Sequence, residues 1–227
     1  MSATSVADGD VALERPRRTP FWRTSNFRRL IRHKSFMIGL VLFSFVMILA
    51  IFAPWIAPSD PNRTAIRLRF RAPDWDWVLL LGTDNLGRNI LSRVVFGAQL
   101  SLAIGFGVVV MNAVFGVLLG AVAGYFRKLD GPLMRLADAL MAFPAILLAI
   151  GIAAALGPSA WTAVIALSVV YVPRTARIVR ASVLVVREME FVQAARAAGA
   201  GHWRIISKHV MPNCMAPLIV QLSFIFA

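Results

Sequence analysis

Residues 100–126 read LSLAIGFGVVVMNAVFGVLLGAVAGYF, and this stretch decides the class of fold. Its 27 residues include no charged side chain. As a helix it would be about 40 Å long, enough to cross a hydrocarbon core of about 30 Å. Gly116, Gly120 and Gly124 recur every fourth residue and would let another helix approach closely. The stretch predicts a transmembrane helix with a packing face, in which the polar Asn112 makes an interhelical hydrogen bond.

The composition of the whole chain supports a membrane protein. Of its 227 residues, 59% are hydrophobic and 15% are charged, and the mean hydropathy is +0.72. Soluble domains carry about 25% charged residues. The net charge of +13 in so apolar a chain favours cytoplasmic loops and contact with membrane lipid over nucleic-acid binding. The single cysteine excludes an intrachain disulfide, and the absence of phosphate-loop, metal-ligand and nucleophile motifs predicts no catalytic residue, cofactor or metal.

The other apolar runs complete the prediction of an all-α integral membrane protein. The first transmembrane helix is expected at 36–57, and the third at about 133–156 with a kink at Pro144. The fourth is expected to begin near Trp161. The last run, 216–227, would be only about 18 Å long as a helix, which is too short to span. We therefore expect the sequence to end inside a fifth membrane helix and the chain as written to insert poorly.

The distribution of Lys and Arg predicts the topology. Eight cations lie in the basic tail 1–35, three lie in or beside the turn between the second and third spans (Arg127, Lys128 and Arg135), and seven lie in 174–213. Only six lie in 58–99. Since cytoplasmic loops are enriched in cations, the N-terminus and 174–213 are predicted inside and 58–99 in the periplasm.

The periplasmic segment contains a turn-rich motif, LGTDNLGRN at 81–89. Thr83 or Asp84 is expected to cap a helix. The apolar spacing that follows, through about residue 98, predicts an amphipathic helix on the outer membrane interface that leads into the second span.

The segment 174–213 contains a second motif, EFVQAARAAGAGHWRIISKHVMPN at 190–213. Gly199 is placed to end one helix and Pro212 to end another. We call residues 188–212 the knob and interpret it as a docking element for a partner; the alternative is that it packs only on the chain's own spans. One apolar stripe is expected on the first helix, formed by Phe191, Ala194, Ala195 and Ala198, and another on the second, formed by Trp203, Ile206 and Val210.

These two motifs resemble those of the inner-membrane permeases of ABC importers, in particular the second permease subunit of the dipeptide, oligopeptide and nickel family. The knob is similar to the superfamily's cytoplasmic signature, with Gln193 in place of its Glu. The residues that match the signature at its spacing are Ala194, Ala195, Gly199 and Pro212. The residues that match the family's stretch before the second span are Gly82, Thr83, Asp84, Gly87 and Arg88.

The resemblance implies a six-span fold, of which this chain has four spans and part of a fifth. It implies half of a translocation pathway for peptides or a related small solute in the bacterial inner membrane. The partners would be a second homologous permease, two ABC ATPases that hydrolyse ATP, and an extracytoplasmic substrate-binding protein. The ATPase would dock on the matched knob residues, with Arg196 and Arg204 reaching its acidic groups. Tryptophan at Ala195 or valine at Gly199 would then detach the ATPase, and tryptophan at Val192 is expected to be milder.

Two alternatives come from other classes. A secondary transporter would need ionisable groups at the bilayer midplane, and the only acid inside a predicted span, Asp138, is interpreted as pairing with Arg135 or the neighbouring loop. A membrane scaffold subunit would not need the knob. ATPase and binding-protein genes beside this one would distinguish the importer from both.

Overall fold

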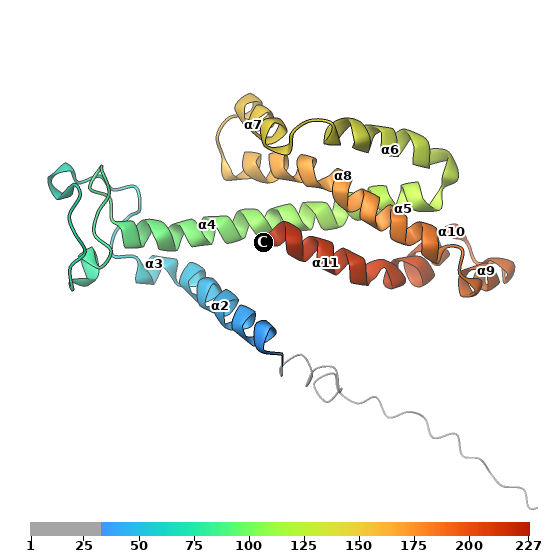
Figure 1. The fold of residues 1–227 in the computed structure, drawn as a ribbon, viewed down its shortest axis with the longest axis horizontal. Coiled ribbons are helices and arrows are strands. Elements are labelled where there is room, and N and C mark those ends of the chain that lie inside the picture. The colour runs from blue at the N-terminus through green and yellow to red at the C-terminus, as the bar shows by residue number, and fades with distance from the viewer. Residues whose placement is uncertain (1–32) are drawn as a thin grey trace, which may run out of the picture. The chain divides into compact units, whose positions relative to one another are not determined.

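The computed structural model describes residues 33–227, which form helices and loops with no β-strand in that range (Figure 1). This confirms the predicted all-α class. The basic tail predicted for 1–35 lies outside the described residues apart from its last three positions. The chain divides into two compact units, 1–48 and 49–227, and each is described by itself.

The first predicted span is formed by two helices. Helix α2 (Lys34–Ile51) is long and apolar enough to cross a membrane. Helix α3 (Ala53–Ile56) follows with Pro54 in its first turn, where the missing N–H has no helical partner to lose. The expected single span through residue 57 is therefore interrupted after Ile51.

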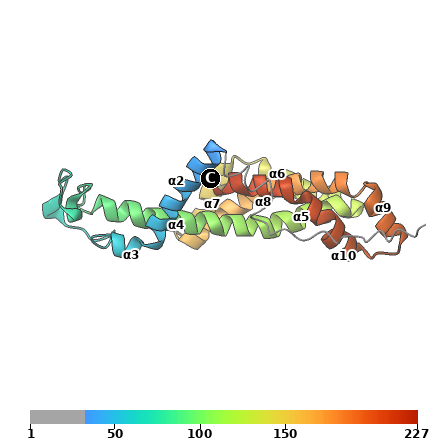
Figure 2. The same cartoon turned by 90° about the horizontal axis from the view of Figure 1, so that it is seen from below.

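The second predicted span is the C-terminal three quarters of a longer helix. Helix α4 (Ile90–Met111), a π-helical turn η4 (Asn112–Gly116) and helix α5 (Val117–Tyr125) follow one another without a break. Together they make 36 residues, or about 54 Å, against about 30 Å of hydrocarbon. The helix predicted through residue 98 is confirmed, but it forms the first turns of α4 in line with the second span and so does not lie flat on the interface (Figures 1 and 2).

The π-helical turn begins at a buried polar contact. Asn112 Nδ2 donates to the carbonyl oxygen of Val108 at 2.9 Å. Its Oδ1 accepts from Thr175 Oγ1 at 3.1 Å, and both side chains are fully buried. Thr175 belongs to helix α8 (Ala160–Val186), so the predicted interhelical hydrogen bond of Asn112 is confirmed.

The glycine face of the long helix packs directly on α8. A Cβ atom on Gly116 would lie 2.7 Å from Thr175 Cβ, and one on Gly120 would lie 2.5 Å from the carbonyl oxygen of Ala176. On Gly124 it would lie 2.8 Å from Val183 Cβ. Real side chains do not approach so closely, so only glycine permits this contact between α5 and α8.

The third predicted span is broken rather than kinked. Helices α6 (Arg127–Met141) and α7 (Ala145–Leu156) meet at an angle of 89°. Pro144 precedes the first turn of α7, in extended backbone, and so starts a new helix instead of bending one.

Two ion pairs join α6 to α8. Asp130 accepts from both Nε and Nη2 of Arg180, the latter at 2.6 Å. Asp138 pairs with Arg177 and not with Arg135, which the sequence had offered as one partner. The acid predicted inside a span is thus neutralised by a cation that the sequence placed in 174–213.

The C-terminal part is helical almost throughout. Helix α9 (Glu190–Ala197) is followed by α10 (His202–Ile205), the π-helical turn η5 (Ile206–Val210), the 3-10 turn η6 (Met211–Cys214) and α11 (Met215–Phe226). Pro212 lies in the first turn of η6, and the helical chain continues across it, so the predicted helix end there is wrong. The helical range His202–Phe226 is long and apolar enough to span a membrane, so the 12-residue final run is the second half of a longer helical stretch. Four helices of the described chain meet this criterion, or up to five if the bent pair counts as one.

Candidate functional site

The segment 58–89, which we call the cap, is organised by its two motif glycines. Gly82 and Gly87 have φ of +71° and +72°. A Cβ on Gly82 would overlap the backbone of Arg71, and one on Gly87 would overlap the backbone of Ala65. Both the left-handed conformation and the close approach require glycine. The motif therefore holds a loop that precedes it in sequence.

The polar residues of the motif complete the same arrangement. Thr83 is buried, donates from Oγ1 to the carbonyl oxygen of Leu68, and accepts from the backbone N–H of Arg71 at 3.0 Å. Asp84 accepts from the backbone N–H groups of Leu86 and Arg88, each at 2.9 Å. Through these hydrogen bonds, Thr83 and Asp84 hold the backbone of the neighbouring loops in place.

Hydrogen-bond donors around Asp84 stabilise the ionised form of its carboxyl group. Desolvation raises the pKa of this carboxyl, but the backbone N–H groups of Arg88 and Leu86 and the side chains of Arg88 and Arg93 outweigh it. The pKa consequently lies well below its ordinary value. Because folding lowers this pKa, the charged Asp84 carboxylate stabilises the fold at every pH above about 3.9, the pKa of Asp in an unfolded chain. This contribution to stability is lost only as the pH falls below that value.

The N-cap residue of helix α4 is Asn89, not Thr83 or Asp84 as the sequence predicted. Asn89 Oδ1 accepts from the backbone N–H of Ser92 at 2.9 Å, and its Nδ2 donates to the carbonyl oxygen of Val78. Asn is among the preferred N-cap residues. The sequence signal that favours it is its position directly before Ile90, the first residue of the apolar spacing.

In the knob, Gly199 has the left-handed conformation that the sequence predicted, with φ of +82°. The N–H of Gly199 bonds to the carbonyl oxygen of Arg196, and the N–H of Ala200 to that of Ala195, both at 3.0 Å. This pair of bonds is the Schellman closure of a helix C-terminus. It turns the chain sharply between α9 and α10.

The inner face of the knob packs on the transmembrane helices. Val192, Ile205 and Val210 are fully buried and join one apolar cluster with Val179 and Val183 of α8. This corrects two expectations. Val192 is a core residue, so tryptophan there is not expected to be milder. In the second helix Ile206 and Val210 pack inward as predicted, together with the fully buried Ile205, whereas Trp203 is exposed.

The outer face of the knob is open. Phe191, Ala194 and Ala198 are exposed and Ala195 is half-buried. Trp203 is 77% exposed. The structure thus keeps the predicted α9 stripe together and leaves it unpacked within residues 33–227.

Two contacts that the sequence did not reveal join α5 to the knob and to Arg187, the residue before it. Tyr125 Oη lies 2.9 Å from His202 Nδ1, although the two residues are 77 positions apart. Arg187 Nη1 donates to the carbonyl oxygen of Gly124 at 2.6 Å. No local pattern connects such distant residues, so only the folded chain identifies them.

A hollow lined by three arginines lies between the knob and the start of α6. Its volume is about 480 Å³, and Arg127, Arg187 and Arg196 line it together with Glu188. Arg196 and Arg204 are exposed and make no ion pair with any residue of the described chain. Pro212 is exposed at the far end of the knob.

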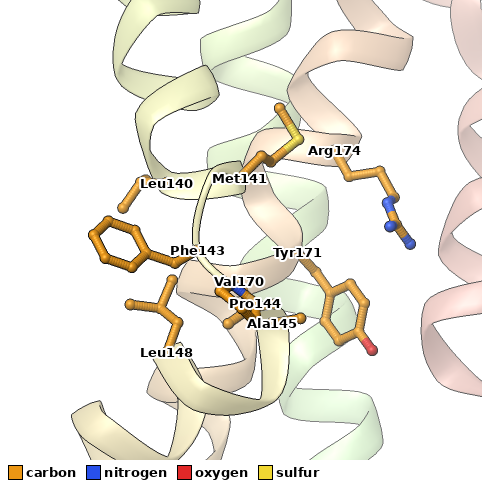
Figure 3. A pocket seen from close by; sticks show the side chains of 9 residues that line it. All are labelled: Leu140, Met141, Phe143, Pro144, Ala145, Leu148, Val170, Tyr171 and Arg174. Atoms are coloured by element: carbon orange, nitrogen blue, oxygen red, sulfur yellow. The ribbon is translucent and has the colours of Figure 1, made fainter.

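A second hollow lies at the break between α6 and α7. It has a volume of about 610 Å³. Figure 3 shows Phe143 and Leu148 on one side and the side chains of Tyr171 and Arg174 pointing away on the other. The hollow is therefore lined by apolar side chains at the break and by the phenol of Tyr171 and the guanidinium of Arg174 from α8.

Comparison with known proteins identifies the family. Residues 112–227 match the family described as binding-protein-dependent transport system inner membrane component. Residues 20–73 match the N-terminal TM domain of oligopeptide transport permease C. The two matches cover both the knob and the first part of the cap.

Individual relatives agree. A protein of Brucella abortus named as a peptide transport system permease protein is 56% identical over 88% of this chain and 67% of its own length. The di/tripeptide transport system permease protein DppC of Pseudomonas aeruginosa is 42% identical over 91% of this chain and 68% of its own. The dipeptide transport system permease protein DppC of Escherichia coli is 44% identical over 86% of this chain and 67% of its own. The chain spans about two thirds of the length of these relatives.

The apolar helices and the family matches make the chain a multi-pass inner-membrane protein that works with other subunits of a transporter. Its family consists of transport permease subunits. The chain belongs to the binding-protein-dependent transport system inner membrane components and is a permease subunit of an ABC importer.

Proposed function

We propose that this chain forms half of a pathway for small peptides and that its knob transmits ATP-driven movement from separate ATPase subunits. The second half of the pathway would be a homologous permease, and an extracytoplasmic binding protein would deliver the substrate. The names of the relatives support peptides as the substrate class.

The observation that carries the docking role is the two-faced packing of α9. Val192 is buried against α8, which ties the movement of α9 to that of a transmembrane helix. The opposite side presents Ala194 and Ala198 to solvent. Small side chains on an exposed helix leave room for another protein to close over the backbone.

Charge around α9 supports an acidic partner surface. Arg196 and Arg204 project from the knob, and the adjoining hollow is lined by Arg127 and Arg187. Charge-assisted hydrogen bonds from arginine to carboxylates are short and strong and add specificity to an interface. An ATPase with acidic groups at its docking face fits this surface.

Changing Ala194 to Trp tests the docking role. The side chain is exposed, so tryptophan should be accommodated in the free knob but should keep an interface from closing. Overpacking typically costs about 1–3 kcal/mol, which is about a five- to 150-fold loss of affinity. We expect the ATPase to stop co-purifying with the permease and uptake of labelled dipeptide to be lost, while the amount of permease in the membrane is unchanged.

A small residue at position 194 is the matched control, and a pair of changes at Gly199 tests the turn that follows α9. Ala194→Ser keeps the side chain small and should leave co-purification and uptake at the wild-type level. Gly199→Val should impair docking because a β-branched residue resists a positive φ, at a cost of about 1–2 kcal/mol, whereas Gly199→Asn tolerates that conformation. No atom within 4 Å would meet a Cβ on Gly199, so the pair differs in backbone preference alone. Normal co-purification with Ala194→Trp would contradict the docking role of α9.

We further propose that the N-terminus and the knob face the cytoplasm and the cap faces the periplasm. The excess of cations in 1–35 and 174–213 supports this orientation. The paired helices also run parallel, with Gly107 beside Val164 and Gly124 beside Val183, which places the cap and the knob at opposite ends of the bundle.

Single cysteines test the orientation in a background in which Cys214 is changed to Ala. A thiol at Asn62 in the cap should react with a membrane-impermeant maleimide added to intact cells. A thiol at Ser207 in the knob should react only after the cells are lysed. Labelling of Ser207→Cys in intact cells would reverse the proposed orientation.

A further inference from the structure

The hollow at the break between α6 and α7 has the size of a small-molecule site. Helix α6 ends at Met141, and α7 begins at Ala145 at an angle of 89° to it. The two helices therefore do not continue as one wall along α8, and a space of about 610 Å³ is left at the corner. Pockets for small ligands commonly have volumes of about 300–1,000 Å³.

The cation in this hollow, Arg174, is unpaired. Helix α8 carries three arginines at intervals of three residues, Arg174, Arg177 and Arg180. Arg177 is paired with Asp138 and Arg180 with Asp130, both on α6. Because α6 ends three residues after its last acid, it supplies no third carboxylate. The guanidinium of Arg174 is exposed and makes no ion pair or hydrogen bond with any residue of the described chain.

A second free donor lies beside this guanidinium. Tyr171 precedes Arg174 by three residues on α8, so the two side chains share a face of that helix. The phenol hydroxyl of Tyr171 has no hydrogen-bond partner among residues 33–227. A carboxylate accepts two parallel hydrogen bonds from arginine and has further lone pairs for a hydroxyl donor. The pair of donors therefore fits a carboxylate.

The opposite side of the hollow is apolar and uncovered. Figure 3 shows Phe143 and Leu148 across from Tyr171 and Arg174. Phe143 is 62% exposed, so no described part of the chain fills this side. None of the nine residues that line the hollow is acidic, so it offers a partner for a carboxylate and none for an ammonium group.

From these observations we infer that the hollow binds the C-terminal residue of a small peptide during its passage through the permease. Arg174 and Tyr171 would donate to the terminal carboxylate, and Phe143 and Leu148 would contact the last side chain. The inference rests on the proposed importer function. A lipid phosphate is also an anion, but a terminal amino acid carries its carboxylate and its side chain on one carbon atom. It can therefore use the donors and the apolar side of one hollow together, which favours a peptide.

Photo-cross-linking in the complete transporter tests which molecule occupies the hollow. With p-benzoylphenylalanine in place of Phe143, illumination during uptake of a radiolabelled dipeptide should attach the label to this chain. An excess of unlabelled dipeptide should suppress the labelling. An adduct with phospholipid or with another protein chain, without label from the dipeptide, would overturn the inference.

Changes at the two donors test their roles, both in this cross-linking background and in the otherwise wild-type chain. Arg174→Gln removes a charge-assisted hydrogen bond, so the adduct and the maximal rate of uptake should fall about tenfold or more. Tyr171→Phe removes one neutral donor and should lower both about threefold. Arg174→Lys keeps the charge and should retain most of both. Because the free guanidinium stabilises no internal contact, the amount of permease in the membrane should not change.

The matched control is Arg135→Gln. Arg135 is an exposed arginine of α6 that makes no ion pair within the described chain and does not line the hollow. The adduct and uptake should remain at the wild-type level. Wild-type uptake and labelling by Arg174→Gln, or an equal loss with Arg135→Gln, would overturn the inference.

Failure of this inference is distinguishable from failure of the proposed function. If ATPase subunits do not co-purify with the wild-type chain and the wild-type transporter takes up no dipeptide, the importer proposal fails. If both are normal, and Arg174→Gln transports as well as wild type, only the carboxylate site at the break fails.

Discussion

Changing Gly120 to Val is expected to prevent assembly of the transmembrane bundle. A Cβ at this position would lie 2.5 Å from the carbonyl oxygen of Ala176 and 2.7 Å from Val179 Cβ. The first of these atoms is backbone, so the overlap is relieved only if α5 and α8 move apart. That separation would also break the hydrogen bond between Asn112 and Thr175. We expect destabilisation of about 3 kcal/mol or more and little intact permease in the membrane fraction.

Gly97→Val is the matched control for this change. Gly97 lies in the same continuous helix, and a Cβ there would meet no atom within 4 Å. The amount of permease, measured by immunoblot of membranes, and its melting temperature in detergent should remain close to wild type. If Gly120→Val were as abundant and as stable as Gly97→Val, the close contact between α5 and α8 would be wrong.

Changing Val192 to Trp is expected to unfold the knob and to abolish ATPase coupling together with it. Val192 is fully buried in the cluster that contains Val186, Ile205 and Val210. Indole is far larger than the isopropyl group, and overpacking of a filled core typically costs about 1–3 kcal/mol. The α9 helix has only eight residues and depends on this packing for its stability. Limited proteolysis should then cut at Arg196 in the variant under conditions in which the wild-type knob resists.

The neighbouring change Phe191→Trp provides the comparison. Phe191 is 43% exposed, so a larger ring there adds volume toward solvent. The protease resistance of the knob should be retained. If Val192→Trp were no more sensitive than Phe191→Trp, the burial of Val192 would be contradicted.

The knob shows how far periodicity alone carries a prediction. The spacing of Phe191, Ala194 and Ala198 placed these residues together on one face, and they do share one. The same spacing could not say whether that face turns toward the chain or away from it. Tryptophan at Val192, on the opposite face, was therefore expected to be the milder change, whereas the cluster around Val183 buries Val192 and leaves the alanines open.

Helix ends in this chain depended on more than proline and glycine. Gly199 ends α9 because a positive φ and two local hydrogen bonds suffice. Pro212 does not end a helix because the π-helical turn before it and the 3-10 turn that contains it continue the helical path. Pro144 starts α7 at a break of 89°, where a simple kink was expected.

The sequence by itself determined the membrane class, the approximate positions of the apolar helices, the glycine face, the Gly199 turn and the family. Each of these depends on composition or on residues a few positions apart, and such local patterns act through helix geometry, hydrophobic transfer and backbone sterics. Only the tertiary structure decided which face of α9 is buried, that Arg177 neutralises Asp138, that Tyr125 meets His202, and that the motif at 81–89 holds the backbone of the loop 65–71. The hydrogen bonds and the ion pair among these contacts join residues from 12 to 77 positions apart. Their partners are set by how whole helices and loops pack, which no local pattern encodes.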